Sequence, residues 1–391
     1  MHYDSIIIGG GAAGLMCAAT AGYRDRKVMI LDHANKVGKK ILMSGGGRCN
    51  FTNFNIAPNN YLSANNHFCK SALSRYTPAD FIELVERYGI AYHEKALGQL
   101  FCDNKASDIL NLLLSECEYA GVTIHTQCEI FVVSKTAQGF DLQTTLGDFT
   151  CESLVVATGG LSIPTLGATG KGYDLARQFG LKCTATQASL VPFTITDKWA
   201  PVISDLSGLS LEVRVTCNKQ QFREPLLFTH RGLSGPAVLQ ISNYWHSGDT
   251  IAVDFYPAGN LLELMQQWRA QGNKSELKNL LATVLPKRFA KAWLEQSVGN
   301  KPLHQYNDKE LTRIVQHFHQ WTITPSSTEG YRTAEVTRGG VDTDEVSSKT
   351  FEAKKVAGLY FVGEVLDVTG WLGGFNFQWA WASGYCAGQY V

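Results

Sequence analysis

The sequence predicts an α/β protein in which a parallel sheet is covered by helices and interrupted by a long insert. Three observations lead to this fold class. Residues 3–8 read as a buried strand, run directly into a glycine-rich turn at 9–14, and are followed by a helical pattern that ends at Gly22. From about 189 to 257 the pattern is one of short alternating strands, and from 258 to 332 it is helical. Thr77 and Asn307 are expected to cap helices that begin just after them. After residue 333 glycine-rich strand endings return, so residues 1–188 and 333–391 are expected to form one discontinuous domain.

Length and composition narrow the class of protein. A chain of 391 residues suits two or three domains. Lysine plus arginine equals aspartate plus glutamate, 35 each, so no overall field attracts nucleic acid or an anionic membrane, and neither partner is expected. The ten cysteines form no C-x-x-C pair, and the initial Met runs straight into a core strand. No apolar run approaches the ~18 residues of a membrane span. We therefore expect a cytoplasmic protein with reduced thiols.

The turn Gly9-Gly10-Gly11-Ala12-Ala13-Gly14 has the G-x-G-x-x-G spacing between a strand and a helix. In a Rossmann-type fold the first glycine permits the tight turn, the second lets the backbone approach a pyrophosphate, and the third lets helix and strand pack closely. A second strand, 27–31, ends at Asp32, whose carboxylate can accept hydrogen bonds from an adenosine ribose. These residues predict a dinucleotide site.

Two later segments favour a flavin dinucleotide. The stretch Ser44-Gly45-Gly46-Gly47-Arg48-Cys49-Asn50 combines a glycine triplet with polar donors, and irregular structure is expected both there and in the basic stretch 36–40 before it. Near the C-terminus, a strand ends in Gly363-Glu364, and a glycine-rich turn at 370–374 opens the last helix. The positive end of that helix can stabilise the negative charge that reduction places on a flavin ring. The loop 167–172 is expected to lie over the cofactor.

Together these segments, with 157–160, 229–236 and 337–341, resemble the BaiN/RdsA-like family of NAD(P)/FAD-dependent oxidoreductases, which includes bile-acid-pathway reductases and aminoacetone-oxidase-like flavoproteins. A looser likeness joins them to fumarate-reductase-type flavoproteins. The resemblance implies a Rossmann-type FAD-binding domain of the glutathione-reductase/fumarate-reductase-like kind, with an inserted β-barrel (189–257) and helical subdomain (258–332). It also implies that Ile130 touches the adenine, that Glu364 lies near the ribityl chain and that 373–376 lie near the ring.

The sequence departs from that pattern in ways that shape the cofactor prediction. The ribose ligand is commonly Glu in such folds and is Asp32 here. The insert has no second G-x-G-x-x-G, so NAD(P)H would dock only transiently. No His lies in 44–50, so the FAD is expected to be non-covalent. The candidate cofactor-binding residues are Gly9, Gly11, Ala12, Ala13, Gly14, Asp32, His33, Lys39, Lys40, Ser44, Gly45, Gly46, Arg48, Cys49, Asn50, Ile130, Ala157, Thr158, Gly159, Gly363, Glu364, Asp367, Gly373, Gly374 and Asn376.

Four residues are candidates for catalysis. Cys49 beside Arg48 could have a lowered thiol pKa, although a small packing residue is the favoured alternative. His230 could act as acid or base and Arg231 could hold an anionic group, with a structural turn equally favoured. Arg338 precedes two glycines and could contact substrate or flavin. No metal site is expected.

The main functional hypothesis is an FAD-dependent oxidoreductase that reduces an activated C=C or C=O bond of a small or medium organic substrate with NAD(P)H. An O2-dependent amine oxidase of the aminoacetone type is the alternative within the same class. A flavin-bound RNA-modifying protein, or a regulatory or storage flavoprotein, is the alternative from another class. The zero net charge argues against the RNA alternative. Lys287, Arg288 and Lys291 form a local basic patch, which is expected to be a solvated helix face. The substrate and the oligomeric state stay open.

Overall fold

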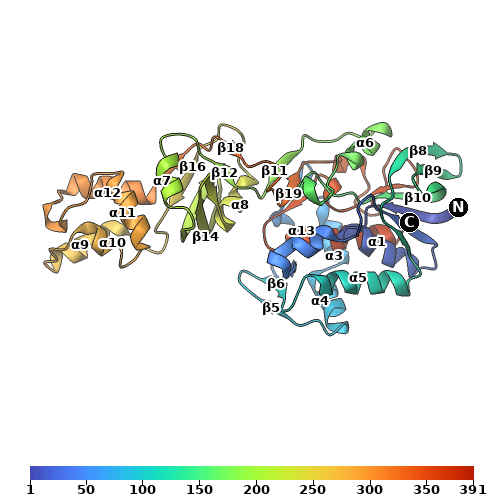
Figure 1. Cartoon of the computed structure of the whole chain (residues 1–391), viewed down its shortest axis with the longest axis horizontal. Helices are drawn as coiled ribbons and strands as arrows, with labels where there is room; N and C mark the ends of the chain where they lie inside the picture. The colour runs from blue at the N-terminus through green and yellow to red at the C-terminus, as the bar shows by residue number, and fades with distance from the viewer. The chain divides into compact units, whose positions relative to one another are not determined.

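The computed structural model describes all 391 residues and divides into two compact units. The first comprises Met1–Ala188 and Glu335–Val391, and the second is the continuous stretch Ser189–Ala334. Each unit has its own sheet and its own helices (Figure 1). None of the helices is long and apolar enough to cross a membrane.

The first unit is built on a sheet with a parallel core. Its strands are β1 (His2–Ile8), β2 (Val28–Leu31), β7 (Thr123–His125), β8 (Ile130–Thr136), β9 (Gly139–Thr144), β10 (Gly147–Val156) and β20 (Leu359–Phe361). Strands β7, β2, β1, β10 and β20 lie in that order and are parallel, while the first half of β10 pairs antiparallel with β9, which pairs with β8. Strand β2 and the second halves of β1 and β10 are fully buried, as expected of parallel strands covered on both faces.

The parallel register aligns the strand ends. Ile8 lies opposite both Leu31 and Val156, and Val156 lies opposite Phe361. The segments that follow these four residues therefore emerge at the same edge of the sheet. Ligands of open α/β sheets bind outside the carboxyl ends of the strands, where neighbouring connections diverge. Strands β1 and β10 form such a point, because β2 continues the sheet on one side and β20 on the other.

Seven helices belong to the first unit: α1 (Ala12–Gly22), α2 (Lys39–Met43), α3 (Cys69–Arg75), α4 (Pro78–Arg87), α5 (Ser107–Tyr119), α6 (Lys171–Gln178) and α13 (Phe375–Gly388). Helix α1 packs between α5 and α13 (Figure 1). Small residues allow the close approach: a Cβ on Gly384 would lie 2.4 Å from the carbonyl oxygen of Ala13, and one on Gly388 would lie 2.8 Å from that of Cys17. The first and last helices of the chain are thus neighbours.

Short strands complete this unit: β3 (Asn50–Asn53), β4 (Tyr61–Leu62), β5 (Tyr92–Glu94), β6 (Gln99–Cys102), β11 (Gln187–Ser189), β19 (Val336–Arg338) and β21 (Thr369–Gly370). The expected cap of α4 is confirmed, since Thr77 and Asp80 exchange the two hydrogen bonds of a capping box. The expectation of irregular structure throughout the basic stretch is wrong in part, because α2 forms there. Gly38 starts it in the left-handed conformation at φ 69°.

The second unit holds an antiparallel sheet and a group of helices. Its strands are β12 (Phe193–Thr194), β13 (Ser210–Cys217), β14 (Gln220–Thr229), β15 (Gly232–Ser234), β16 (Ile251–Asp254), β17 (Trp321–Ile323) and β18 (Ser327–Thr328). They pair in the order β17-β16-β13-β14-β15-β12-β18. The two edge strands of this order, β17 and β18, are joined by residues 324–326 alone, so the sheet curls until its edges meet within about 13 Å of chain.

The helices of the second unit are α7 (Ala200–Asp205), α8 (Pro236–Ser242), α9 (Leu261–Ala270), α10 (Leu277–Leu281), α11 (Lys287–Glu295) and α12 (Asp308–His319). A buried aromatic cluster joins sheet and helices: Phe255 of the sheet lies with its ring centroid 4.9 Å from that of Phe289 and 4.7 Å from that of Trp293, both on α11. The expected cap of α12 is confirmed by the capping box between Asn307 and Glu310.

Candidate functional site

The turn between β1 and α1 has three glycines with different constraints. Gly9 has φ 107°, and a Cβ there would lie 2.5 Å from the carbonyl oxygen of Ala157. A Cβ on Gly14 would lie 2.0 Å from the carbonyl oxygen of Gly9, so helix and strand touch at this position. A Cβ on Gly11 would meet nothing within 4 Å. The backbone at Gly11, at the start of α1, is therefore open to a ligand, and the N–H groups of the first helical turn are available to phosphate oxygens.

Asp32 ties the end of β2 to this turn. Its Oδ2 accepts the Gly10 N–H at 2.8 Å and its Oδ1 accepts the Ala34 N–H at 2.8 Å. A carboxylate has about four acceptor positions, so it can still receive hydroxyl groups. The exposed His33 lies beside Asp32, with Nδ1 3.8 Å from Oδ1. The chain leading to Ile130 passes the same place, because Cys128 N–H donates to the Asp32 carbonyl oxygen at 2.9 Å.

The loop 167–172 lies along this side of the site. A Cβ on Gly167 would come within 3.0 Å of His33 Nε2, and one on Gly172 would lie 2.2 Å from Thr158 Oγ1. The Thr158 hydroxyl is buried beneath α6 and has no hydrogen-bond partner in the protein. Its side chain thus points toward α6, while its backbone borders Gly9.

The stretch 44–50 is held in place along its length. Gly45, Gly46 and Gly47 have φ of 57°, 66° and 86°, a run that only glycine adopts readily. Gly47 accepts the Ala106 N–H through its carbonyl oxygen at 2.7 Å. A Cβ on Gly45 would lie 2.9 Å from the Phe101 ring, whereas Gly46 and Gly47 face open space. An open, fixed glycine backbone is what close approach of a cofactor needs, and a flexible surface loop would lack these contacts.

Cys49 does not have the activated thiol that its candidacy for catalysis requires, and it fits the favoured alternative of a small packing residue. Cys49 is fully buried, and this burial raises the pKa of its thiol to about 12, outweighing the hydrogen bond from Ser44 that lowers it. The backbone of Cys49 is left-handed at φ 49°. The neighbouring Arg48 is exposed, and neither its guanidinium group nor the ammonium group of Lys39 makes a hydrogen bond or ion pair within the protein. Both side chains therefore remain available to an anionic ligand.

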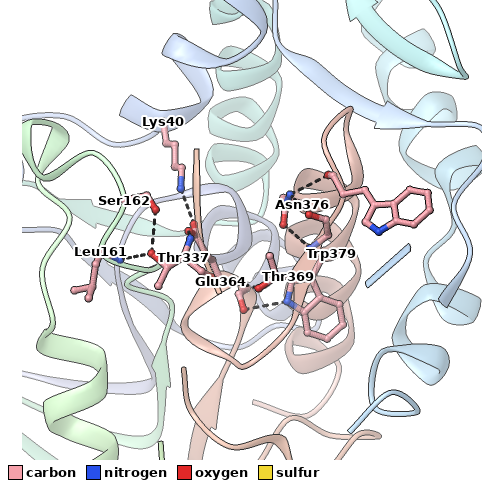
Figure 2. Close-up of polar contacts among 11 residues, drawn as sticks. Lys40, Leu161, Ser162, Thr337, Glu364, Thr369, Asn376 and Trp379 are labelled. Carbon is pink, nitrogen blue, oxygen red and sulfur yellow. Dashed lines mark hydrogen bonds and ion pairs between the residues drawn. The ribbon is translucent and has the colours of Figure 1, made fainter. Parts of the chain in front are cut away.

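Glu364 is the centre of a network that the sequence did not reveal (Figure 2). Its Oε2 accepts Lys40 Nζ at 2.7 Å, and its Oε1 accepts the Thr337 N–H at 2.8 Å. Thr337 Oγ1 in turn accepts the Leu161 N–H at 2.8 Å. Through these bonds Glu364 fastens α2, β19 and the segment after β10 to one another. Its side chain is only 18% exposed. Glycine is required at 160, because a Cβ there would lie 2.6 Å from Thr337 Oγ1.

The glycine turn before α13 is fixed by Asn376. Its Oδ1 accepts the Gly370 N–H at 2.8 Å, and its Nδ2 donates to the Gly370 carbonyl oxygen at 2.9 Å (Figure 2). Gly373 and Gly374 have φ of 110° and 92°, and a Cβ on Gly374 would lie 2.4 Å from the Thr52 carbonyl oxygen. The start of α13 therefore lies directly against β3, the strand that follows 44–50. Trp379 Nε1 donates to the Gly363 carbonyl oxygen at 3.0 Å, which links α13 to the end of β20.

The packing of α13 on α1 sets the spacing of the two helix N-termini. Gly384 lies at the Ala13 end of α1, and Gly388 lies further along it, so the two helices run in the same direction. Helix α13 begins at Phe375, nine residues before Gly384, which corresponds to about 13 Å at 1.5 Å per residue. The glycine turns at 9–14 and 370–374 thus mark the ends of a long site, as suits a cofactor with a pyrophosphate at one end and a ring that gains negative charge at the other.

The remaining predicted residues are Asp367, Arg338, His230 and Arg231. Asp367 is buried, its Oδ2 accepts the Ala64 N–H at 2.9 Å, and burial raises the pKa of its carboxyl group. Arg338, on β19, is the cation that acts against this shift. His230 and Arg231 belong to the second unit, where both are exposed at the turn between β14 and β15. Arg231 Nε lies 3.9 Å from Glu329.

Comparison with known proteins gives full-length matches. The sequence profile described as the HI0933-like protein Rossmann domain matches residues 3–390. Two proteins named ribosomal RNA dihydrouridine synthase, from Escherichia coli K12 and from Haemophilus influenzae Rd, are each 51% identical over 99% of this chain and 98% of their own length. A 3-dehydro-bile acid Δ(4,6)-reductase from Clostridium scindens is 30% identical over 98% of this chain and 97% of its own. A solved 3-ketosteroid-Δ4-(5α)-dehydrogenase from Rhodococcus jostii RHA1 superposes with TM-score 0.51 at 14% identity, covering 99% of this chain and 97% of that one.

These findings confirm the predicted family, the Rossmann-type FAD-binding fold and the prediction of a flavoenzyme. They contradict two other predictions. The expected small or medium organic substrate and the expected lack of a nucleic-acid partner are wrong, because the two relatives at 51% identity carry the name of an enzyme that acts on ribosomal RNA. The alternative of an RNA-modifying flavoprotein is the better one.

Proposed function

We propose that this chain, which belongs to the HI0933-like Rossmann-domain family, is an FAD-dependent enzyme that reduces a uridine of ribosomal RNA to dihydrouridine. The observation that carries the proposal is the full-length likeness to two proteins of that name, with no insertion or deletion large enough to remove a domain. A likeness of this extent includes both units and every segment of the candidate site.

The site residues fit non-covalent FAD. The open backbone at Gly11 and the first turn of α1 would hold the pyrophosphate. Asp32 would accept hydroxyl groups of the adenosine ribose, next to Ile130. The open glycines 46 and 47 and the turn 373–376 would border the ring. Arg48 and Lys39 would balance the negative charge of the bound cofactor.

The reaction class follows from the structure of uridine. Its C5=C6 bond is conjugated with the C4 carbonyl group, so it accepts a hydride at one carbon and a proton at the other. Bound FAD supplies hydride transfer. The balanced reaction is uridine plus NAD(P)H plus a proton, giving dihydrouridine plus NAD(P)⁺. The chain would contribute the positive N-terminal end of α13, which would stabilise negative charge on the bound flavin.

We take NADH or NADPH as the electron donor. The donor and the RNA would bind at the flavin one after the other. One G-x-G-x-x-G is present and it belongs to the α1 turn, so no separate nicotinamide domain is provided. A uridine within folded RNA must leave its stack before a buried ring can reach it. The donor and the base would therefore occupy the ring in separate half-reactions.

The distribution of charge supports an RNA partner despite the balanced total. Residues 258–320 contain nine lysines and arginines and five acids. Three of those acids are committed to ion pairs with Arg269, Lys278 and Lys301. Helix α11 buries Phe289 and Trp293, and exposes the basic patch of Lys287, Arg288 and Lys291 on its other side. Such a patch can neutralise phosphates.

The test uses purified holoprotein, NADH or NADPH and ribosomal RNA transcribed in vitro, which lacks dihydrouridine. Digestion to nucleosides and mass spectrometry should show a nucleoside two mass units heavier than uridine that depends on protein, FAD and reductant. Transfer RNA transcripts serve as the control substrate. Absence of that nucleoside from ribosomal RNA with both reductants, with the flavin shown to be reduced, would contradict the proposal.

A further inference from the structure

We propose that Phe54 and Leu97 form an apolar platform beside the start of α13 on which a base of the RNA substrate stacks. The choice of RNA as the partner rests on the proposed function. The platform itself is inferred from the exposure, the anchoring and the position of these two residues in the first unit.

Both residues expose most of their apolar surface at neighbouring turns. Phe54 follows β3 and is 54% exposed, and Leu97 precedes β6 and is 63% exposed. The Phe54 N–H donates to the Gly98 carbonyl oxygen at 2.9 Å, so the two turns are hydrogen-bonded to each other. A single exposed apolar residue needs no explanation, but a phenylalanine and a leucine presented by two turns that are hydrogen-bonded to each other are unusual.

Asn53 anchors the two turns that carry Phe54 and Leu97 to the candidate site. Its side chain is buried, and its Nδ2 donates to the Gly373 carbonyl oxygen at 2.8 Å and to the Leu97 carbonyl oxygen at 3.2 Å. The Asn53 side chain therefore bridges the glycine turn that opens α13 and the backbone of Leu97. A base lying on the platform would be adjacent to a base held at the start of α13.

The outward position of Leu97 is enforced. Its backbone is left-handed at φ 53°, a conformation that is unfavourable for leucine. A second amide, Asn55 Nδ2, also donates to the Leu97 carbonyl oxygen at 3.2 Å. The surrounding bonds thus hold an apolar side chain toward solvent in a conformation it does not prefer. Such strain is found where the position of a residue has a use.

An unstacked RNA base is the partner that these features fit. Proteins read single-stranded RNA by stacking its bases on exposed aromatic side chains. Lys95, two residues before Leu97, is exposed, and its Nζ lies 5.2 Å from the centroid of the Phe101 ring. It forms no ion pair with a carboxylate, so it can approach a backbone phosphate. A flat apolar contact with one adjacent cation matches a nucleotide better than it matches the broad apolar area of a stable protein interface.

The experiment compares three holoprotein variants, Phe54→Ser, Phe54→Trp and Phe131→Ser. Phe131 is the matched control, since it is 60% exposed and lies on β8 at the sheet edge. FAD content and elution volume on a sizing column are measured first. Two readouts follow: quenching of a single-stranded oligoribonucleotide carrying 2-aminopurine beside uridine, and kcat/KM for dihydrouridine formation on ribosomal RNA transcripts.

We expect Phe54→Ser to lose the quenching and to lower kcat/KM about ten- to a hundredfold, mainly through KM. Phe54→Trp should keep both within about twofold, and Phe131→Ser should match the unchanged protein. Quenching that is indifferent to Phe54, or a Phe54→Ser variant that changes only the elution volume, overturns the platform. If the unchanged protein quenches in a Phe54-dependent way but makes no dihydrouridine, the platform stands and the proposed function falls.

Discussion

At the scale of single residues, a substitution at Gly11 should affect FAD binding alone, whereas one at Gly14 should also affect folding. A Cβ on Gly11 meets no protein atom within 4 Å and its φ of −85° suits any residue, so Gly11→Ala should leave the melting temperature of the apoprotein unchanged or slightly higher. The same methyl group would occupy the space that a pyrophosphate needs. We predict a loss of FAD affinity of roughly tenfold or more, measured by titration of apoprotein with FAD.

Gly14→Ala is the matched comparison within the same turn. Its Cβ would lie 2.0 Å from the Gly9 carbonyl oxygen, so the helix must shift from the strand. We expect a loss of unfolding free energy of about 1–3 kcal/mol, with FAD binding lost as a consequence. If Gly11→Ala binds FAD as tightly as the unchanged protein, the pyrophosphate does not lie at this turn.

Cys49 illustrates how burial overrides a neighbouring charge. The sequence places Arg48 beside it, and the structure places its sulfur in the core with a pKa of about 12. At pH 8 about one thiol in ten thousand would then be ionised. We predict that iodoacetamide leaves Cys49 unmodified in the native holoprotein and modifies it after unfolding in urea, as read by peptide mass spectrometry. Rapid modification of the native protein would show that the sulfur is accessible.

At the scale of elements, the sequence was most informative where one local signal dominates. The caps at Thr77 and Asn307 were predicted because hydrogen bonds between residues three apart determine them, and the strand–turn–helix at 3–22 was predicted because the glycine spacing marks its turn. Helix α8 was missed: it is seven residues long, and its start depends on Gly235 at φ 87° before Pro236. Helix α2 was missed for a similar reason, since tertiary contacts of Gly38 decide it.

In the candidate site too, local sequence signals were predicted and contacts between distant residues were not. The glycine turns at 9–14 and 370–374 were found because glycine spacing carries the signal. The bond between Lys40 and Glu364 joins residues 324 apart, and Thr337 enters through its backbone N–H, so no pattern in the sequence contains them. The exposed Phe54 and Leu97 carried no signal either, because exposure is a property of the folded chain.

Helix α11 gives a prediction at the same scale. Its basic patch should add phosphate contacts, each of which contributes to the salt dependence of RNA binding. We predict that the double change Lys287→Gln and Lys291→Gln weakens binding of ribosomal RNA transcripts and reduces the slope of log K against log salt by about two. The double change of the same residues to Arg keeps the charge and should bind normally. Equal salt slopes for the Gln and Arg variants would show that this face of α11 does not contact phosphates.

At the scale of the whole molecule, the total charge argued against the RNA partner that we propose. Equal numbers of acids and bases argued against nucleic acid, yet the surplus of cations in 258–320 is balanced by acids elsewhere in the chain. Net charge describes the field at long range, whereas RNA binding depends on local contacts within about a Debye length. The substrate could not be derived from composition for this reason, and it became arguable only from the full-length relatives.

The whole molecule should also lose stability in alkaline solution, because many thiols are buried. Burial raises the pKa of Cys117 and of Cys151 to about 12, as it does for Cys49. An unfolded thiol ionises near pH 9. Between these values the unfolded chain binds fewer protons than the folded one, so the free energy of unfolding falls as pH rises above about 9.

The contribution of one thiol can be isolated at Cys117, which is fully buried, donates to the Leu15 carbonyl oxygen at 3.4 Å and lies outside the candidate site. At pH 10 an unfolded thiol gains about 1.4 kcal/mol from ionisation, which the folded thiol cannot match. Urea unfolding at pH 7 and pH 10, with reductant present, should therefore show a smaller pH-dependent loss for Cys117→Ala, by about that amount. Ionisable groups common to both proteins cancel in this difference. Equal losses would mean that the Cys117 thiol titrates alike in the folded and unfolded chains.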